Sequence, residues 1–216
     1  MDPLHFCIGV APLSVYFLMI GLINLKGRPF VTTGARDAAA LGIGVCGLVI
    51  AGPMELFFPE GAASQFGGYV WLMLIVFYGL CVSLIVLLMR ARIVIYNLST
   101  DELLPILKSL THRLDRETKW AGSSVLMPNL NVHLNVESVD WVRNIQLCAS
   151  GSHQSYEGWR ILESELRKEL GAIKVAPNLI GIGLLVVSGF LSFAAAIWMV
   201  SDQQAVAQAF NEMLRR

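Results

Sequence analysis

Four long apolar runs divide this chain and set the tightest limit on what it can fold into. The runs cover residues 4–25, 38–58, 69–89 and 175–200. A helix needs about 20 residues, each rising ~1.5 Å, to cross a hydrocarbon core about 30 Å thick. Each run is long enough to do so. The pattern therefore predicts four transmembrane helices.

The composition argues against a soluble fold. Hydrophobic residues make up 55% of the 216 residues and charged residues 15%. A soluble domain has about 25% charged residues. A soluble protein would also have to bury four helices that are apolar all round, and the remaining chain is too short to cover them. We therefore interpret the chain as an α-helical integral membrane protein whose first partner is the lipid bilayer.

The basic residues predict the topology. All Lys and Arg residues except Arg215 and Arg216 lie between the first and second runs or between the third and fourth. The positive-inside rule places both connections in the cytoplasm and both termini outside. A bacterial inner membrane fits best, because the sequence carries no eukaryotic sorting signal.

A secretory signal peptide is the alternative interpretation of the first run. Such a peptide carries its positive charge before the apolar stretch. Here Lys26 and Arg28 follow the run, and the residues before it include no Lys or Arg. This order favours an uncleaved span.

The segment between the third and fourth runs is predicted to form an inserted cytoplasmic α+β domain of order β-α-β-β-β-α. Apolar residues recur there with period two in some stretches and with helical period in others. The economical arrangement is an antiparallel sheet with two helices on one face. The predicted strands cover residues 93–96, 119–126, 130–137 and 143–149, and the predicted helices cover residues 99–114 and 155–170.

These predictions divide the chain into four parts. Residues 1–92 hold three transmembrane helices, and residues 93–174 form the cytoplasmic domain. Residues 175–200 form the fourth transmembrane helix, and residues 201–216 form an external tail. The tail is weakly amphipathic, so it either extends the last helix or lies on the membrane surface.

One face of the predicted sheet gathers amides, an imidazole and a carboxylate. Such groups on a rigid sheet can recognise a polar ligand or a peptide backbone, but a solvated sheet face has the same composition. We therefore consider a solvated face, a ligand or partner surface, and a catalytic surface. This candidate polar face comprises Asn131, His133, Asn135, Glu137, Asn144 and Gln146.

No cofactor, metal or nucleic acid is predicted. His112, His133 and His153 lack metal-ligand spacing. The sequence has no nucleophile-elbow motif, phosphate loop or dinucleotide fingerprint. Acidic and basic residues are nearly balanced in the domain, which does not favour nucleic-acid binding.

Glu55 is the ionisable residue that lies clearly inside an apolar run. A carboxylate within a span is costly to desolvate and is by default a candidate functional site. Glu55 also lies close to Pro59 at the end of the run, so its side chain can instead reach the lipid headgroups. Both interpretations stay open from the sequence.

Small residues recur at helical spacing in two of the runs. Such residues let helices approach closely in lipid. The stripes either pack within the chain's own bundle or form a face for another membrane protein or a second copy. They comprise Ala38, Gly42 and Cys46 in the second run, and Ser188, Ser192 and Ala196 in the fourth.

Three functions are compatible with these features. The first is a non-enzymatic assembly subunit or adaptor that presents the cytoplasmic domain to a partner or ligand. The second is a membrane-associated enzyme with His133 and Glu137 as acid and base. The third is a small transporter that depends on Glu55. The sequence favours the first, because it contains no recognisable catalytic motif and few polar groups within the spans.

Overall fold

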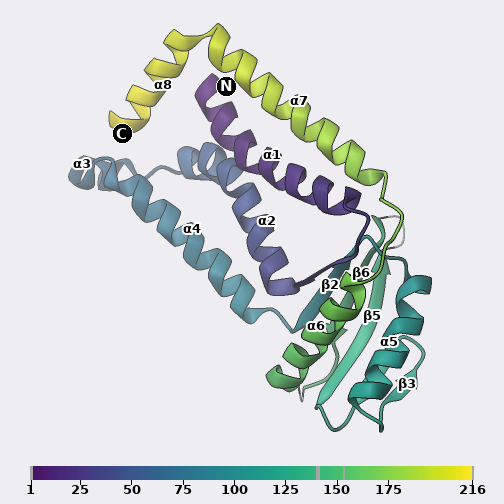
Figure 1. The fold of residues 1–216 in the computed structure, drawn as a ribbon. Helices are drawn as coiled ribbons and strands as arrows, with labels where there is room; N and C mark the ends of the chain where they lie inside the picture. Colours follow the sequence, from purple (N-terminus) through teal and green to yellow (C-terminus); the bar gives the residue numbers. More distant parts are fainter. Residues whose placement is uncertain (1, 140–141, 153, 216) are drawn as a thin grey trace. The chain divides into compact units, whose positions relative to one another are not determined.

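The computed structural model describes residues 2–139, 142–152 and 154–215 and shows a mostly helical chain with one sheet (Figure 1). The chain divides into two compact units, which we name the helical unit and the sheet unit. The helical unit comprises Met1–Ile20, Ala39–Leu87 and Gly183–Arg216, and the sheet unit comprises Gly21–Ala38 and Leu88–Ile182.

Within the described residues, four helices are long and apolar enough to cross a membrane, as predicted. They are α1 (Pro3–Leu25), α2 (Gly34–Val49) with its π-helical continuation η1 (Ile50–Met54), α4 (Tyr69–Leu88) and α7 (Ile180–Ser201). Two shorter helices are α3 (Glu60–Phe66) and α8 (Gln203–Arg215). Helix α7 begins later than its apolar run, because the Asn178 side chain accepts a hydrogen bond from the Ile180 amide at 3.1 Å and caps the first turn.

Close contacts join neighbouring helices in the helical unit. Gly47 of α2 lies against the carbonyl oxygen of Ile8 in α1, where any side chain would collide. On α4, the Tyr78 hydroxyl donates to the carbonyl oxygen of Gly42 at 2.7 Å. Helix α7 contacts α1, because the hydroxyl of Ser188 donates to the carbonyl oxygen of Ser14 at 2.8 Å. Thus α2 packs on α1 and α4, and α7 packs on α1.

The described strands form a six-stranded antiparallel sheet of order β1-β2-β6-β5-β4-β3. They are β1 (Phe30–Thr33), β2 (Arg92–Tyr96), β3 (Lys119–Ala121), β4 (Ser124–Met127), β5 (Val132–Val139) and β6 (Asn144–Ala149). Strand β1 comes from the connection between α1 and α2, where no strand was predicted. It adds to the edge of the sheet by pairing with β2, with Val31 opposite Ile95.

The prediction of one strand over residues 119–126 is wrong. Strands β3 and β4 are two arms of a hairpin in which Ala121 is opposite Ser124. Gly122 has a φ of +61°, which a glycine adopts without steric cost, and it forms the two-residue turn with Ser123. After the first helix, the domain therefore contains one strand more than the predicted order.

Both helices of the sheet unit pack on the same face of the sheet. Helix α5 (Thr100–Leu114) begins with a capping box in which Ser99 and Glu102 satisfy each other's amides, and Ser155 caps α6 (Tyr156–Gly171). Buried apolar residues of the two helices and of the sheet form one core. Its helix residues are Leu103, Leu107, Leu110, Trp159, Leu162, Leu166 and Leu170, and its sheet residues include Val31, Ile93, Ile95, Val125, Leu134, Ile145 and Leu147.

Candidate functional site

The strand register brings most of the candidate polar face together. Glu137 of β5 is opposite Gln146 of β6, and Asn135 is opposite Cys148. Because side chains alternate along a strand, His133, Asn135 and Glu137 share a face with their β6 partners and with Asn144. Asn131 does not belong to this ladder. It precedes β5 in a turn with a φ of +49°, and its carbonyl oxygen accepts a hydrogen bond from the Ser155 amide at 2.8 Å.

Part of this face is covered by the chain itself. Val94 of β2 points to the same side and is fully buried, and Thr32 and Tyr96 beside it are also buried. The Tyr96 hydroxyl donates to the Asp37 carboxylate in the first turn of α2 at 2.6 Å.

The part of the face over β4, β5 and β6 is open. Glu137 is exposed, and so is Leu126 of β4. We name this part the open polar face. It comprises Ser124, Leu126, His133, Asn135, Glu137, Gln146 and Cys148.

A thiol and a guanidinium, which the sequence did not single out, belong to this site. Burial raises the pKa of Cys148, and the Glu137 carboxylate that accepts its hydrogen bond raises it further, against a smaller opposing effect of Arg92. The thiol is therefore protonated at neutral pH and is a poor nucleophile. Arg92 donates to the side-chain oxygen of Gln146 at 3.4 Å. The Cys148 contact with Glu137 depends on the pairing of β5 with β6, and the Arg92 contact with Gln146 depends on the pairing of β2 with β6.

Hydrogen bonds within the chain hold two parts of the open polar face, the Asn135 side chain and the His133 backbone. The side-chain oxygen of Asn135 accepts from the hydroxyls of Ser123 at 2.8 Å and Ser124 at 3.4 Å. The amide side chain of Gln154 bonds both the N–H and the carbonyl oxygen of His133. The Asn135 side chain and the His133 backbone are therefore held in place.

The described residues include no cluster of three His, Cys, Asp or Glu side chains that could hold a metal ion. His153, one of the three domain histidines, and Trp141 lie outside the described residues.

Glu55 lies at a distorted helix end and has a partner. It follows η1, the π-helical turn that contains Pro53, a residue without an amide N–H to donate. One carboxylate oxygen of Glu55 lies 3.1 Å from Nε2 of His5, and Nδ1 of His5 lies 3.7 Å from the Asp2 carboxylate. Sequence reasoning missed His5. The available signal was that a carboxylate inside a span needs a polar partner.

A polar junction within the sheet unit joins three segments. The side-chain N–H of Asn178, just before α7, donates to the carbonyl oxygen of Val142 at 2.9 Å, and its backbone N–H donates to that of Asn24 in α1 at 3.0 Å. Asn24 and Asn178 are buried. The junction therefore fixes the end of α1, the residues before β6 and the start of α7 to one another.

Arg143 extends this junction to α5. Its guanidinium donates to the carbonyl oxygen of Ala176 at 2.9 Å and to Glu102 at 3.1 Å. Hydrogen bonds from the Ser99 backbone and side chain, together with Arg143, lower the pKa of Glu102. The carboxylate stays charged at neutral pH and holds both Arg143 and the start of α5.

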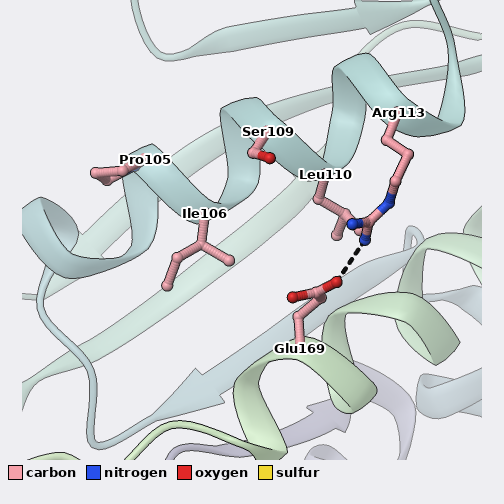
Figure 2. A pocket seen from close by; sticks show the side chains of 6 residues that line it. All are labelled: Pro105, Ile106, Ser109, Leu110, Arg113 and Glu169. Atoms are coloured by element: carbon pink, nitrogen blue, oxygen red, sulfur yellow. Dashed lines mark hydrogen bonds and ion pairs between the residues drawn. The ribbon is translucent and has the colours of Figure 1, made fainter.

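A shallow groove of about 290 Å³ runs between α5 and α6 (Figure 2). The ion pair between Arg113 and Glu169 bridges the two helices there. The two charged side chains of the groove neutralise each other in this ion pair. The lining residues are Pro105, Ile106, Ser109, Leu110, Arg113 and Glu169.

The two small-residue stripes differ in their surroundings. In the second run, Gly42 packs on Val82 of α4. In the fourth run, Ser188 is buried against α1, whereas Ser192 and Ala196 are exposed. Helix α7 thus turns part of its stripe toward the chain's own bundle and part away from it.

Comparison with known proteins supplies no relative from which a role can be transferred. No family model, curated protein or solved structure matches this chain. Any assignment of function therefore rests on the open polar face, the His5–Glu55 pair and the junction.

Proposed function

We propose that the chain is a multi-pass membrane protein that serves as a non-enzymatic assembly subunit or adaptor. In this proposal α1, α2, α4 and α7 cross a bacterial inner membrane with both termini outside. Residues 93–174 then form a cytoplasmic domain that presents a binding surface. The length and apolar character of the four helices support insertion. The concentration of Lys and Arg in two connections supports the orientation.

The open polar face is the observation that carries the binding role. It exposes a carboxylate, Glu137, and an apolar side chain, Leu126, beside ordered amides. Intramolecular hydrogen bonds hold Asn135 and the backbone of His133 in place. A surface of this kind loses little conformational entropy when a polar partner binds. The occupant that fits is a protein segment that offers hydrogen-bond donors and a small apolar contact.

The geometry supports binding better than catalysis. His133 and Glu137 belong to one extended strand, so four residues at ~3.3 Å each place them about 13 Å apart along it. The two side chains are too far apart to act on the same proton. Glu137 instead accepts a hydrogen bond from the protonated thiol of Cys148. His133 and Glu137 therefore do not form the acid–base pair that the enzyme alternative requires.

Site-specific photo-crosslinking in native membranes tests the adaptor role. A photoreactive residue replaces Glu137 in the full-length protein, and the matched control replaces Arg160, whose side chain is exposed on α6. We expect a discrete crosslinked protein from position 137 and none from position 160. Substitution of Asn135 by Asp should abolish that product while the protein stays in the membrane. Identical products from both positions, or none from either, would overturn the proposal.

A test of the enzyme alternative uses His133→Ala. If the protein is an adaptor, a His133→Ala variant that still crosslinks to its partner should also keep its biological function. Loss of function with partner, fold and membrane insertion intact would instead favour catalysis.

A further inference from the structure

Two segments that carry basic residues are hydrogen-bonded to each other beside the junction. The backbone N–H of Val175 donates to the carbonyl oxygen of Gly27 at 3.1 Å. Chain segments joined by such a bond run about 5 Å apart, well within the reach of long basic side chains. Lys174 is therefore brought beside Lys26 and Arg28. We name these three residues the basic cluster.

The basic cluster carries exposed positive charge. Lys26, Arg28 and Lys174 are all exposed, and none forms an ion pair with any residue that the structure describes. Six other cations of the sheet unit do form ion pairs, whereas Arg116 and Lys119, like the basic cluster, form none with the described residues. The ion-paired cations are Arg36, Arg113, Arg143, Arg160, Arg167 and Lys168. The basic cluster is thus a local positive site available to an anion.

An exposed leucine lies a few residues from the basic residues in each of the two segments. Leu22 in α1 is 55% exposed, and Leu179 just before α7 is 75% exposed. The hydrogen bond between the Asn178 amide and the Asn24 carbonyl oxygen aligns the two segments. A Cβ atom added at Gly181 would lie only 2.8 Å from the carbonyl oxygen of Gly21, so the two helices approach closely. Cations therefore adjoin an apolar surface that follows the ends of two apolar helices.

We propose that the basic cluster binds the headgroup phosphate of an anionic phospholipid, whose acyl chains lie along Leu22 and Leu179. A basic site at the cytoplasmic end of adjacent spans suits such a lipid, because the headgroup and the acyl chains meet the two kinds of surface at once. A zwitterionic lipid has no net charge for the three cations to attract. The inference rests on the proposed membrane insertion and orientation. The bound lipid would fasten the connection between α6 and α7 to the end of α1.

Native mass spectrometry of the full-length protein tests this site. The protein is purified from bilayers that contain both phosphatidylglycerol and phosphatidylcholine, and the lipid that stays bound is identified. The test variant is Lys26→Gln/Arg28→Gln/Lys174→Gln. The matched control is Arg116→Gln/Lys119→Gln/Arg160→Gln, which removes three exposed cations elsewhere in the sheet unit. At about 1 kcal/mol per basic residue near an anionic surface, each removal should weaken retention roughly fivefold.

We expect the parent and the control to retain phosphatidylglycerol selectively and the test variant to lose that selectivity. Equal retention by all three proteins, or equal loss in the control, would overturn the proposal. If the triple variant fails to insert, Lys174→Gln and Lys174→Arg provide the same test, since the second keeps the charge and should keep the lipid. Failure of the parent protein itself to insert would refute the proposed function, whereas insertion without selective retention would refute this inference alone.

Discussion

The two units of this molecule place the same residue types in opposite environments. In the sheet unit, Leu162 and Leu166 of α6 are fully buried. In the helical unit, Leu84 of α4 is 56% exposed and Phe77 is 65% exposed. The sheet unit thus keeps apolar side chains away from solvent, and the helical unit turns them outward. The contrast supports the proposal that the four long helices lie in a membrane.

Polar contacts differ between the units in the same way. In the helical unit, hydroxyls such as those of Tyr78 and Ser188 bond backbone carbonyl oxygens of neighbouring helices. In the sheet unit, charged side chains such as Glu102 and Asp115 take part in networks. This difference agrees with the proposed membrane insertion, because helices in lipid gain no hydrophobic driving force from association and rely on close backbone contacts and a few hydrogen bonds.

The largest effect should come from truncating a leucine in the core. We expect Leu162→Ala to lower the free energy of unfolding by about 2–5 kcal/mol, because it leaves a cavity in a closely packed core. The matched variant Leu84→Ala should change it by less than about 1 kcal/mol, because that side chain is largely exposed. Denaturant titration of the full-length protein in detergent, followed by tryptophan fluorescence, measures both. An equal cost at Leu84 would show that the helical unit hides a packed surface.

The next largest loss of stability should come from removing the buried carboxylate of Asp115. This change tests the polar contacts inside the sheet unit. Its carboxylate is buried and accepts hydrogen bonds from the Asn129 amide at 2.8 Å, the Asn129 side chain at 2.8 Å and the Glu117 amide at 2.9 Å. Asp115→Ala leaves these donors without their acceptor and should cost about 3 kcal/mol of unfolding free energy. Asp101→Ala, an exposed control, should cost less than about 1 kcal/mol. Equal losses of unfolding free energy in Asp115→Ala and Asp101→Ala would mean that the hydrogen bonds of Asp115 add nothing to stability.

The pH dependence of stability follows from the same carboxylate. Burial acts to raise the pKa of Asp115, but the hydrogen bonds from Glu117 and Asn129 outweigh it and the pKa lies below its ordinary value. The group therefore adds stability that is fully present above its unfolded pKa of about 3.9 and is lost as the pH falls through the folded pKa. The difference in stability between the parent and Asp115→Asn should shrink below about pH 4. A difference that stays constant there would contradict this assignment.

Close backbone contact in the helical unit should give an intermediate effect. Gly47→Val places a side chain against the carbonyl oxygen of Ile8 and should cost about 1–3 kcal/mol through overpacking. Gly79→Val is the matched control in α4, because nothing lies within 4 Å of the position its Cβ would take. Thermal unfolding in detergent compares the two variants. If both lose the same stability, intrinsic helix effects rather than packing between α1 and α2 account for the loss.

Periodicity alone predicted much of the fold. The four long helices, α5 and α6 were expected from runs of apolar residues or from their helical spacing, and the alternation over residues 130–137 predicted most of β5. Strand β1 was missed because four residues between two long helices carry little local signal, and their strand conformation depends on pairing with the distant β2. The sequence of the β3–β4 turn did carry a signal, Gly122, but the prediction of one strand over residues 119–126 ignored it.

The candidate site was predicted less completely. Alternation grouped His133, Asn135 and Glu137, because a strand fixes which residues share a face. It could not reveal that the first turn of α2 covers the β2 end of that face, or that Arg92 reaches Gln146, since both depend on strand order. His5 shows the same limit, because an isolated histidine becomes informative only when another helix brings Glu55 beside it.

The His5–Glu55 pair should give the smallest effect. It compares the coupling free energy of a polar contact in the helical unit with that of an ion pair in the sheet unit. A double-mutant cycle with His5→Ala and Glu55→Gln should yield a coupling of about 0.5–1.5 kcal/mol, because the side chains are 15% and 30% exposed and solvent screens them incompletely. The exposed Arg160–Glu157 pair of the sheet unit, with side chains 67% and 63% exposed and 3.9 Å apart, is the control and should yield less than about 0.5 kcal/mol. Thermal unfolding of the full-length protein in detergent measures both cycles. A coupling at His5–Glu55 no larger than the control would mean that the pair is solvated like a surface contact. The end of α2 would then be held by η1 and its neighbours rather than by a polar bond shielded from water.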